Sequence, residues 1–415
     1  MSDAATATPG ATQDGSAHAS GRLLSVDALR GFDMFWIVGA GTVVKALNKL
    51  ESNAVTSFFT TQLSHVKWEG FHFYDLIFPL FLFIVGTSIV FSLDKAFRLG
   101  GRKAVLRRVF VRSLLLYFLG ILYYGGFSEP WPNIRFGGVL HRIAACYFFS
   151  ALIYTFIRGA RGLLAVSAAL LVVYWALLTF VRVPDLLLTE PEVAAAAERV
   201  GSDSPFAIAA ATEGRIRGNY EEGRNLTNFV DFLFLPGAKA QTYYINEGLL
   251  STLPAIAISL FGILAGQLLK NADVSPAKKL LHLVIGGAVL IALGLLWSMQ
   301  FPLIKRIWTS SFVLVASGLS AWMLALFYWL IDVREWRWWC RPFVWIGCNA
   351  LVIYIGVKIV SFRKLAEWFT GGDIRIFFDR TVGAGAGNFV TAVVSLLLVF
   401  LFARWLYRRK IFVRV

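Results

Sequence analysis

Charged side chains are scarce in this sequence. Of its 415 residues, 16% are charged and 57% are hydrophobic, whereas about 25% of the residues in an average soluble protein are charged. Long apolar runs recur between Met34 and Phe402, and many reach the roughly 20 residues that a helix needs to cross a bilayer. This composition excludes a soluble domain. It predicts an all-α polytopic membrane protein whose helices form one bundle.

Several motifs that are typical of particular enzyme classes are missing. The sequence contains no phosphate-binding P-loop, no HExxH zinc motif, no CxxC pair and no GxSxG nucleophile elbow. The absence of these motifs argues against a metal hydrolase and a serine esterase, and no metal site is expected. The cysteines are Cys146, Cys340 and Cys348, an odd number placed in or beside apolar runs. They imply no disulfide framework.

The N-terminus lacks the parts of a secretory signal peptide. Residues 1–21 are mostly small and polar, with neither a basic n-region nor an apolar h-region. We expect a disordered cytoplasmic tail here and not a cleaved signal. Residues 22–415 then form the membrane domain.

The net charge of +15 would suit nucleic acid, but the placement of the cations argues against such a partner. They cluster in short loops between apolar runs, as the positive-inside rule predicts for cytoplasmic loops. The densest cluster comprises Lys95, Arg98, Arg102, Lys103, Arg107 and Arg108. This cluster predicts that its loop is cytoplasmic and that the preceding loop, which carries His65, lies outside.

Alternation from that loop predicts about ten spans, with both termini cytoplasmic. The predicted spans cover residues 26–47, 73–93, 109–124, 139–157, 163–181, 249–269, 281–299, 312–331, 343–360 and 389–406. Two cation pairs, Lys305–Arg306 and Arg363–Lys364, fall outside in this scheme. They either weaken the scheme or mark external cations with a function.

The external segment 184–246 is longer than an ordinary connection. It contains TEPEVAAAAERVG, which predicts a short helix, followed by a polar stretch. Connections of about sixty residues are usually lids, binding loops or small added elements. A passive insertion is the alternative.

The stretch from Gln62 to Gly86 combines titratable side chains with the start of an apolar run. His65 is a candidate general base, because imidazole titrates near neutral pH; alternatively, it is an ordinary interfacial residue. Asp75 opens the apolar run, where a carboxylate caps a helix and meets the positive end of its dipole. The same carboxylate is also suited to orient the histidine and to stabilise its imidazolium form.

Four further ionisable residues lie within or beside predicted spans. Asp33 is inside the first span, where an unpaired charge is expensive and marks either a functional site or an ion pair between helices. Arg135 and Arg142 lie at the outer start of the fourth span, as interfacial cations or as ligands of an anion. Glu247 either caps the sixth span or binds an acceptor.

Six motifs in this order carry a resemblance to a known family. They are RLLSVDALRG at 22–31, HVKWEG followed by DLIFPLFLFIVGTS within 65–88, IRFGGVLHRIA at 134–144, NEGLLST with the later LFGILAG, IWTSSFV at 307–313 and WIGCNALVIYI at 345–355. Together they resemble the heparan-α-glucosaminide N-acetyltransferase family, within the wider transmembrane acyltransferase group. Some similar bacterial members are linked to N-acetylglucosamine utilisation.

The resemblance implies transfer of acetyl from cytosolic acetyl-CoA to the amine of a glucosamine unit beyond the membrane. It places the catalytic histidine at His65, its acidic neighbour at Asp75 and the family arginine at Arg135. In one departure, Gly39 and Gly41 stand where the animal enzyme has an asparagine, which removes a candidate oxyanion donor. The chain also lacks the large external N-terminal domain, so a small sugar acceptor is expected.

The chemistry of amide formation agrees with these assignments. His65 would take the proton of the attacking amine, and a covalent acetyl-histidine is a variant of this route. The thioester oxygen needs donors as its charge develops. The candidates are Trp68, Arg135 and backbone N–H groups at the start of the second span. The donor-binding residues are predicted as Arg30, Asp33, Trp68, Arg135 and Arg142, with the nucleotide end of acetyl-CoA near Arg30, Arg102 and Arg107, and the acceptor-binding residues as Glu69 and Glu247.

Two rival functions remain open from the sequence. A secondary sugar transporter would use the intramembrane Asp33 as a coupling site, although no inverted hydropathy repeat is evident. A glycan O-acetyltransferase would use the same histidine. In each case we expect a multi-pass protein of the inner (cytoplasmic) membrane in contact with the lipid bilayer, compatible with a homodimer.

Overall fold

The computed structural model describes residues 23–412 as a predominantly helical fold. The first half contains α1 (Leu24–Phe35), the π-helical turn η2 (Trp36–Ala40), α2 (Gly41–Leu50), α3 (Ala54–Gln62), α4 (Phe73–Tyr123), the short turns η3 (Gly126–Ser128) and η4 (Trp131–Asn133), α5 (Val139–Phe156), α6 (Ala160–Phe180), α7 (Glu190–Val200) and α8 (Pro205–Ala211). The second half contains α9 (Leu226–Phe234), α10 (Thr252–Lys270), α11 (Pro276–Ser298), α12 (Ser310–Phe327), the π-helical turn η5 (Tyr328–Val333), α13 (Arg341–Cys348), α14 (Ala350–Ile359), α15 (Phe362–Thr370), α16 (Gly372–Thr381) and α17 (Ala386–Arg408). The predicted disordered tail, residues 1–21, lies outside the described residues.

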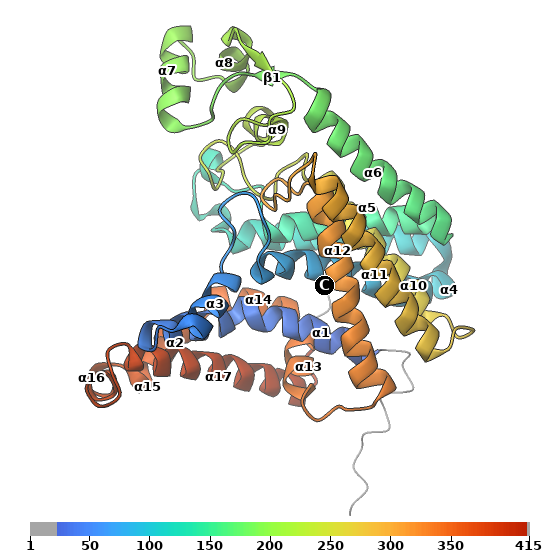
Figure 1. Ribbon diagram of the computed structural model, residues 1–415, viewed down its shortest axis with the longest axis vertical. Coiled ribbons are helices and arrows are strands. Elements are labelled where there is room, and N and C mark those ends of the chain that lie inside the picture. The colour runs from blue at the N-terminus through green and yellow to red at the C-terminus, as the bar shows by residue number, and fades with distance from the viewer. Residues whose placement is uncertain (1–22, 413–415) are drawn as a thin grey trace, which may run out of the picture.

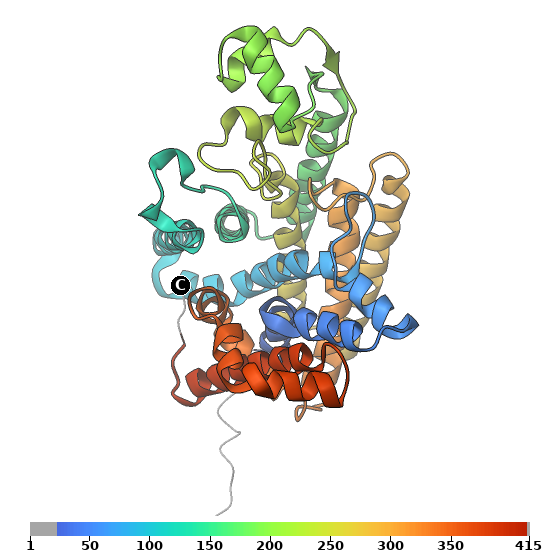
Figure 2. The ribbon, with the colours of Figure 1, turned by 90° about the vertical axis from the view of Figure 1, so that its left-hand side faces the viewer.

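The helices form two groups that meet along α1. Helices α4, α5, α6, α10, α11 and α12 make the larger group, while α1, α2 and α13 to α17 make the smaller one (Figures 1 and 2). Helix α1 packs closely on α13 at Gly31, whose lack of a side chain allows the approach. A Cβ at this position would lie 1.7 Å from the carbonyl oxygen of Phe343. Its contacts with α4 and α12 join the two groups.

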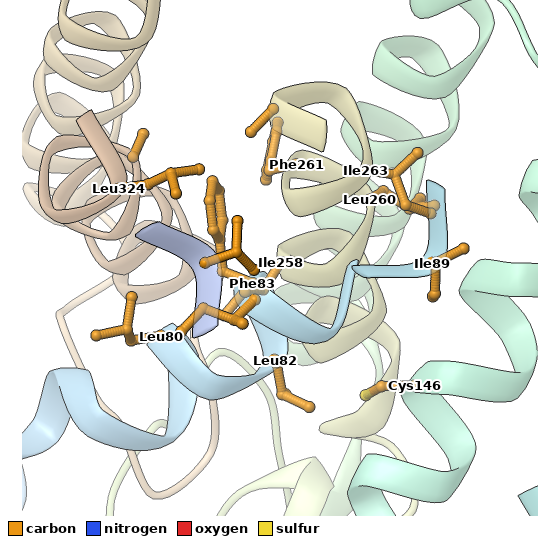
Figure 3. Packing of buried hydrophobic residues seen from close by; sticks show 14 of the residues in the cluster. Leu80, Leu82, Phe83, Ile89, Cys146, Ile258, Leu260, Phe261, Ile263 and Leu324 are labelled. Carbon is orange, nitrogen blue, oxygen red and sulfur yellow. The ribbon is translucent and has the colours of Figure 1, made fainter. Parts of the chain in front are cut away.

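Small residues let α4 and α10 approach at the centre of the larger group. A Cβ on Gly86 would lie 2.0 Å from the Ser259 carbonyl oxygen, and one on Gly262 would lie 2.0 Å from that of Phe83. Around this crossing the buried side chains of Leu82 and Leu260 join the same apolar core (Figure 3). Close backbone contact of this kind is typical of helix packing within membranes. The hydrophobic effect does not drive helices together there, so association depends on the close packing that small residues allow.

The span count differs from the predicted ten. Seven helices of the described part are long and apolar enough to cross a membrane, or eight if the bent pair α13–α14 is one span. The six helices α5, α6, α10, α11, α12 with η5, and α17 correspond to predicted single spans. The differences arise at breaks in the other predicted spans.

Each break has a local cause. Gly39, with φ 154°, divides the predicted first span into α1, η2 and α2, none of which is long enough alone. The second and third predicted spans are the two helical parts of α4, which meet at a kink at Gly101 (φ 64°, ψ −166°), inside the basic stretch where a loop was predicted. The ninth predicted span bends by 78° between α13 and α14, at Asn349.

The outer faces of several helices are apolar. On α11 the exposed large side chains are Leu281, Val284, Ile285, Val289, Leu293, Leu295 and Leu296. Only 17% of the apolar window of this helix is buried. In water such a surface would be costly, whereas hydrocarbon tails solvate it. The chain is therefore a multi-pass membrane protein.

The segment 184–246 forms a small folded unit beyond the end of α6, here called the cap (Figure 1). The predicted short helix is confirmed as α7, which has Glu190 in its first turn and the left-handed Gly201 at its C-terminus. Strands β1 (Val183–Pro184) and β2 (Arg215–Ile216) pair antiparallel, with Val183 opposite Ile216. An apolar cluster that includes Val193, Ile208 and Phe229 gives the cap its own core.

Candidate active site

The first turn of α4 positions the Asp75 carboxylate. His72 is the N-cap residue, and Asp75 reaches back from the third helical position so that its Oδ2 accepts the N–H of His72 at 3.0 Å. The N–H of Val66 donates to the same oxygen at 3.3 Å. The carboxylate is only 1% exposed. A buried charge needs several hydrogen-bond donors, and these two N–H groups supply part of that need. Asp75 therefore helps to cap the helix, which is one of the two roles that the sequence predicted for it.

The other carboxylate oxygen faces the histidine. Nδ1 of His65 lies 2.8 Å from Asp75 Oδ1, and the His65 side chain is 52% exposed. The His65 ring also contacts the ring of Tyr74, with centroids 4.8 Å apart. When Asp75 is ionised, it accepts a hydrogen bond from the Nδ1–H of a neutral imidazole. The lone pair of Nε2 is then free to accept a proton from a substrate.

A third charged group, Lys305, completes this cluster. Its Nζ lies 3.3 Å from Asp75 Oδ1 and 3.0 Å from His65 Nδ1. Burial lowers the pKa of the Lys305 ammonium, and the neighbouring Asp75 carboxylate acts against this effect. Sequence reasoning did not include Lys305 in the site. Its only signal was that the Lys305–Arg306 pair broke the positive-inside pattern.

Backbone contacts bring the Lys305 loop to the histidine. The N–H of Gly70 donates to the Leu303 carbonyl at 2.9 Å, and Glu69 forms an isolated antiparallel bridge with Ile304. These bonds join residues 62–72 to the loop 299–309, here called the lysine loop. The side chain of Glu69, a predicted acceptor ligand, is exposed beside this junction.

Trp68, a predicted donor ligand, is anchored to the cap. Its indole N–H, the only polar hydrogen of the side chain, donates to the Tyr220 carbonyl of the cap at 2.9 Å. The ring packs beside the buried cluster that contains Tyr174 and Phe301. Trp68 therefore connects the cap to the histidine stretch.

Arg142 is the most deeply buried of the predicted arginines, with 1% of its surface exposed. Its Nη2 donates to the Gly248 carbonyl at 3.1 Å and to the Ser251 hydroxyl, while Nε and Nη1 have no partner among the described residues. Its guanidinium lies 4.8 Å from the centre of the Trp308 ring, in the lysine loop. Glu247 interacts electrostatically with both Arg142 and Lys305, so one carboxylate acts on both cations.

Arg135 and Arg30 have neighbours of a different kind. Arg135 donates from Nε to the Gly137 carbonyl at 2.9 Å, and its guanidinium lies 4.1 Å over the Tyr124 ring. Arg30 pairs with Asp27 at 3.2 Å and donates to the Ser88 hydroxyl at 2.6 Å. The structure thus engages Arg30 in contacts among α1, α4 and α13 and does not bring it to the His65 cluster.

Asp33 is fully buried, and neither carboxylate oxygen has a hydrogen-bond partner among the described residues. It interacts electrostatically with Tyr74, whose ring contacts His65. Asn349, at the bend between α13 and α14, is 1% exposed, and its amide atoms are likewise without partners in the described part. Sequence reasoning missed Asn349, for which no periodic pattern gives a signal.

The chain is similar to known proteins over most of its length. Residues 22–192 match the family model described as "Heparan-alpha-glucosaminide N-acetyltransferase, catalytic". The human heparan-alpha-glucosaminide N-acetyltransferase is 25% identical over an alignment of 386 residues, which covers 85% of this chain and 55% of the human protein. The mouse protein of the same name is 23% identical over 395 residues, covering 85% of this chain and 56% of its own length.

This match confirms the resemblance inferred from the motifs, and the chain is a distant homologue of the two mammalian proteins. Their family comprises transmembrane acetyltransferases that use acetyl-CoA. The chain spans about half the length of the curated relatives it matches. The matched range includes His65, Asp75 and Arg142 but ends before Lys305.

Proposed function

We propose that this protein transfers acetyl from cytosolic acetyl-CoA to the amine of a glucosamine-type sugar on the external side of the inner membrane. The observation that carries the proposal is the 2.8 Å contact between His65 Nδ1 and the buried Asp75 carboxylate. This arrangement leaves Nε2 of His65 as a base on an exposed side chain. The match of residues 22–192 to the acetyltransferase family model supports acetyl-CoA as the donor.

The proposed reaction balances with one proton carrier. The nitrogen of the neutral amine attacks the thioester carbonyl, and His65 Nε2 takes the proton that the nitrogen loses. Asp75 stabilises the imidazolium formed in this step. When the C–S bond breaks, the imidazolium returns the proton to the thiolate sulfur, so the products are an N-acetyl sugar and CoA with a free thiol.

Buried donors near the cluster suit the developing charge on the carbonyl oxygen. The unpartnered Nε and Nη1 of Arg142 are the strongest candidates, because donors held in place before reaction stabilise an oxyanion best. Asp33 and Asn349 line the interior of the bundle and would meet polar parts of the donor there. Glu247 and Glu69 are the proposed acceptor ligands.

A detergent assay tests the proposal. Purified protein receives acetyl-CoA and glucosamine, and the release of free CoA thiol is followed with a thiol reagent. We expect His65→Ala to lower turnover by about a hundredfold or more, the usual contribution of a general base. His282→Ala is the matched control, since His282 is exposed on α11 and its Nδ1 bonds to the Lys278 carbonyl of its own helix.

Two further arms address the rival functions. Glucose in place of glucosamine tests O-acetylation, since it has hydroxyls but no amine. A transporter, for which the buried Asp33 is the relevant observation, would move sugar into sealed vesicles and release no CoA. Full turnover by His65→Ala would rule out the catalytic role of this histidine.

A further inference from the structure

Asp75 Oδ1 is shared by two donors. His65 Nδ1 lies 2.8 Å from it, and Lys305 Nζ lies 3.3 Å from it. The two nitrogens are themselves 3.0 Å apart. A carboxylate oxygen accepts two hydrogen bonds, so one oxygen holds the imidazole N–H and the ammonium side by side.

The lysine loop fixes Lys305 in this place. On one side of Lys305, Ile304 is held by its bridge to Glu69, and its N–H donates to Thr309 Oγ1 at 3.1 Å. On the other side, the N–H of Trp308 donates to the Lys305 carbonyl at 3.0 Å. The Lys305 side chain is only 19% exposed. The ammonium is therefore held beside the imidazole and does not move freely in solvent.

The charges of the cluster then follow from simple counting. With His65 neutral, the Asp75 carboxylate and the Lys305 ammonium cancel, whereas protonation of His65 leaves a net positive charge. The Tyr74 ring of α4 also contacts the imidazole, with ring centroids 4.8 Å apart. Glu247, which precedes α10, and Arg306 act on the cluster through Lys305.

We propose that Lys305 is a positioning residue that keeps His65 neutral between turnovers and makes its imidazolium a readier proton donor. This inference rests on the proposed acetyl transfer. Asp75 alone would pair with the imidazolium and retain its proton, because opposite charges within a few ångströms favour the charged form. The ammonium beside Nδ1 opposes that pairing. The proton taken from the amine therefore passes on to the thiolate sulfur as the C–S bond breaks.

The role of Lys305 can be measured without acetyl transfer. Diethyl pyrocarbonate modifies neutral imidazole, and mass spectrometry of the peptide that contains His65 follows its modification across a pH series. In Lys305→Met the midpoint should rise by about one pH unit, the scale expected for losing a nearby like charge. Lys305→Arg, which keeps the charge, should leave the midpoint within about 0.3 units.

Arg306→Met is the matched control. It removes the same charge from the neighbouring residue of the same loop, but Arg306 pairs with Glu222 of the cap and does not contact His65. Its midpoint should match that of the unaltered protein. An unmoved midpoint in Lys305→Met, or an equal rise in Arg306→Met, would overturn the proposal. Lys305→Gln serves the same purpose if the methionine variant aggregates on size-exclusion chromatography.

The acid limb of kcat/KM for CoA release should follow the same midpoints. If the unaltered protein releases no CoA, the proposed function fails, while the modification midpoints still decide whether Lys305 controls the protonation of His65. If CoA is released but the acid limb of Lys305→Met does not move with its modification midpoint, Lys305 has no part in the reaction.

Discussion

The guanidinium of Arg142 stacks 4.8 Å from the centre of the Trp308 ring, and this contact joins α5 to the lysine loop. Trp308 is 1% exposed and has a φ of 54°, in the left-handed region that a bulky residue seldom adopts. Such backbone strain persists only where the surroundings hold it. The stack with Arg142 and the edge contacts with Phe78 and Phe312 supply that support.

Replacement of Arg142 by lysine should cost more than loss of charge would suggest. Lysine keeps the positive charge, but it cannot stack on Trp308 as a planar group and lacks the several N–H donors that a guanidinium holds in a fixed geometry. A lost charge-assisted hydrogen bond is worth about 1.5–3 kcal/mol, which corresponds to a tenfold or greater loss in CoA release. Arg135→Lys is the comparison, because Arg135 stacks on Tyr124 at a partly exposed position and should cost less. Equal rates in the two variants would show that Arg142 has no special place.

Asp33 and Asp27 offer a contrast between a buried carboxylate without a partner in the described part of the chain and a paired one. Asp33→Asn should retain the thermal unfolding midpoint in detergent, since the Asp33 oxygens form no hydrogen bond with any described residue. Asp27→Asn should lower the midpoint by weakening the 3.2 Å pair with Arg30. We also expect Asp33→Asn to lower kcat/KM for acetyl-CoA at least tenfold. Unchanged kinetics would remove Asp33 from the donor site.

The crossing of α4 and α10 should tolerate no added carbon. Gly86→Ala places a methyl group 2.0 Å from the Ser259 carbonyl oxygen, and the helices must separate to accept it. Overpacking of this kind costs about 1–3 kcal/mol or more, so the thermal midpoint should fall clearly. Gly286→Ala is the control, because a Cβ there meets nothing within 4 Å. A similar loss in both variants would mean that the glycines act through helix propensity and not through packing.

The cap should lose stability as the pH rises through a defined window. Asp231 of α9 is fully buried and accepts the N–H of Leu249 at 2.8 Å, and burial raises the pKa of its carboxyl to about 6. The unfolded value is about 4. Because the native state binds the proton more tightly, stability is highest below about pH 4 and falls between about pH 4 and 6, by up to roughly 3 kcal/mol.

Asp231→Asn tests this dependence, because the amide stays neutral throughout. Thermal midpoints of the unaltered protein should fall relative to those of the variant from about pH 4 to 6 and run parallel to them above about pH 7. Curves that stay parallel over the whole range would show that Asp231 does not titrate in the folded cap.

Much of the site's local geometry could be predicted from sequence. Asp75 stands three residues after the N-cap His72, at the start of an apolar run, and such spacing favours a carboxylate that caps the helix and points back along the chain. The proximity of His65 to Asp75 follows from a short connection. Contacts between residues far apart in the sequence could not be predicted in this way, for example the bond from the Trp68 N–H to the Tyr220 carbonyl.

The span scheme failed where single residues override a hydrophobic pattern. Hydropathy records the length of an apolar run but not the backbone angles within it. It therefore missed the break at Gly39 and the 78° bend at Asn349. The break that it predicted in the basic stretch of α4 is confined to the kink at Gly101, and the residues on either side are helical, since lysine and arginine are good helix formers.

The sequence by itself determined that this chain is helical, apolar and built for a membrane, and which histidine has a carboxylate beside it. Those properties depend on composition and on neighbours within a few residues. Only the tertiary structure decided that Lys305, 240 residues from His65, shares the same carboxylate oxygen, and that Arg142 meets Trp308. The pairing of distant segments depends on how close helices can pack and which buried polar groups must be satisfied, and no local pattern records either.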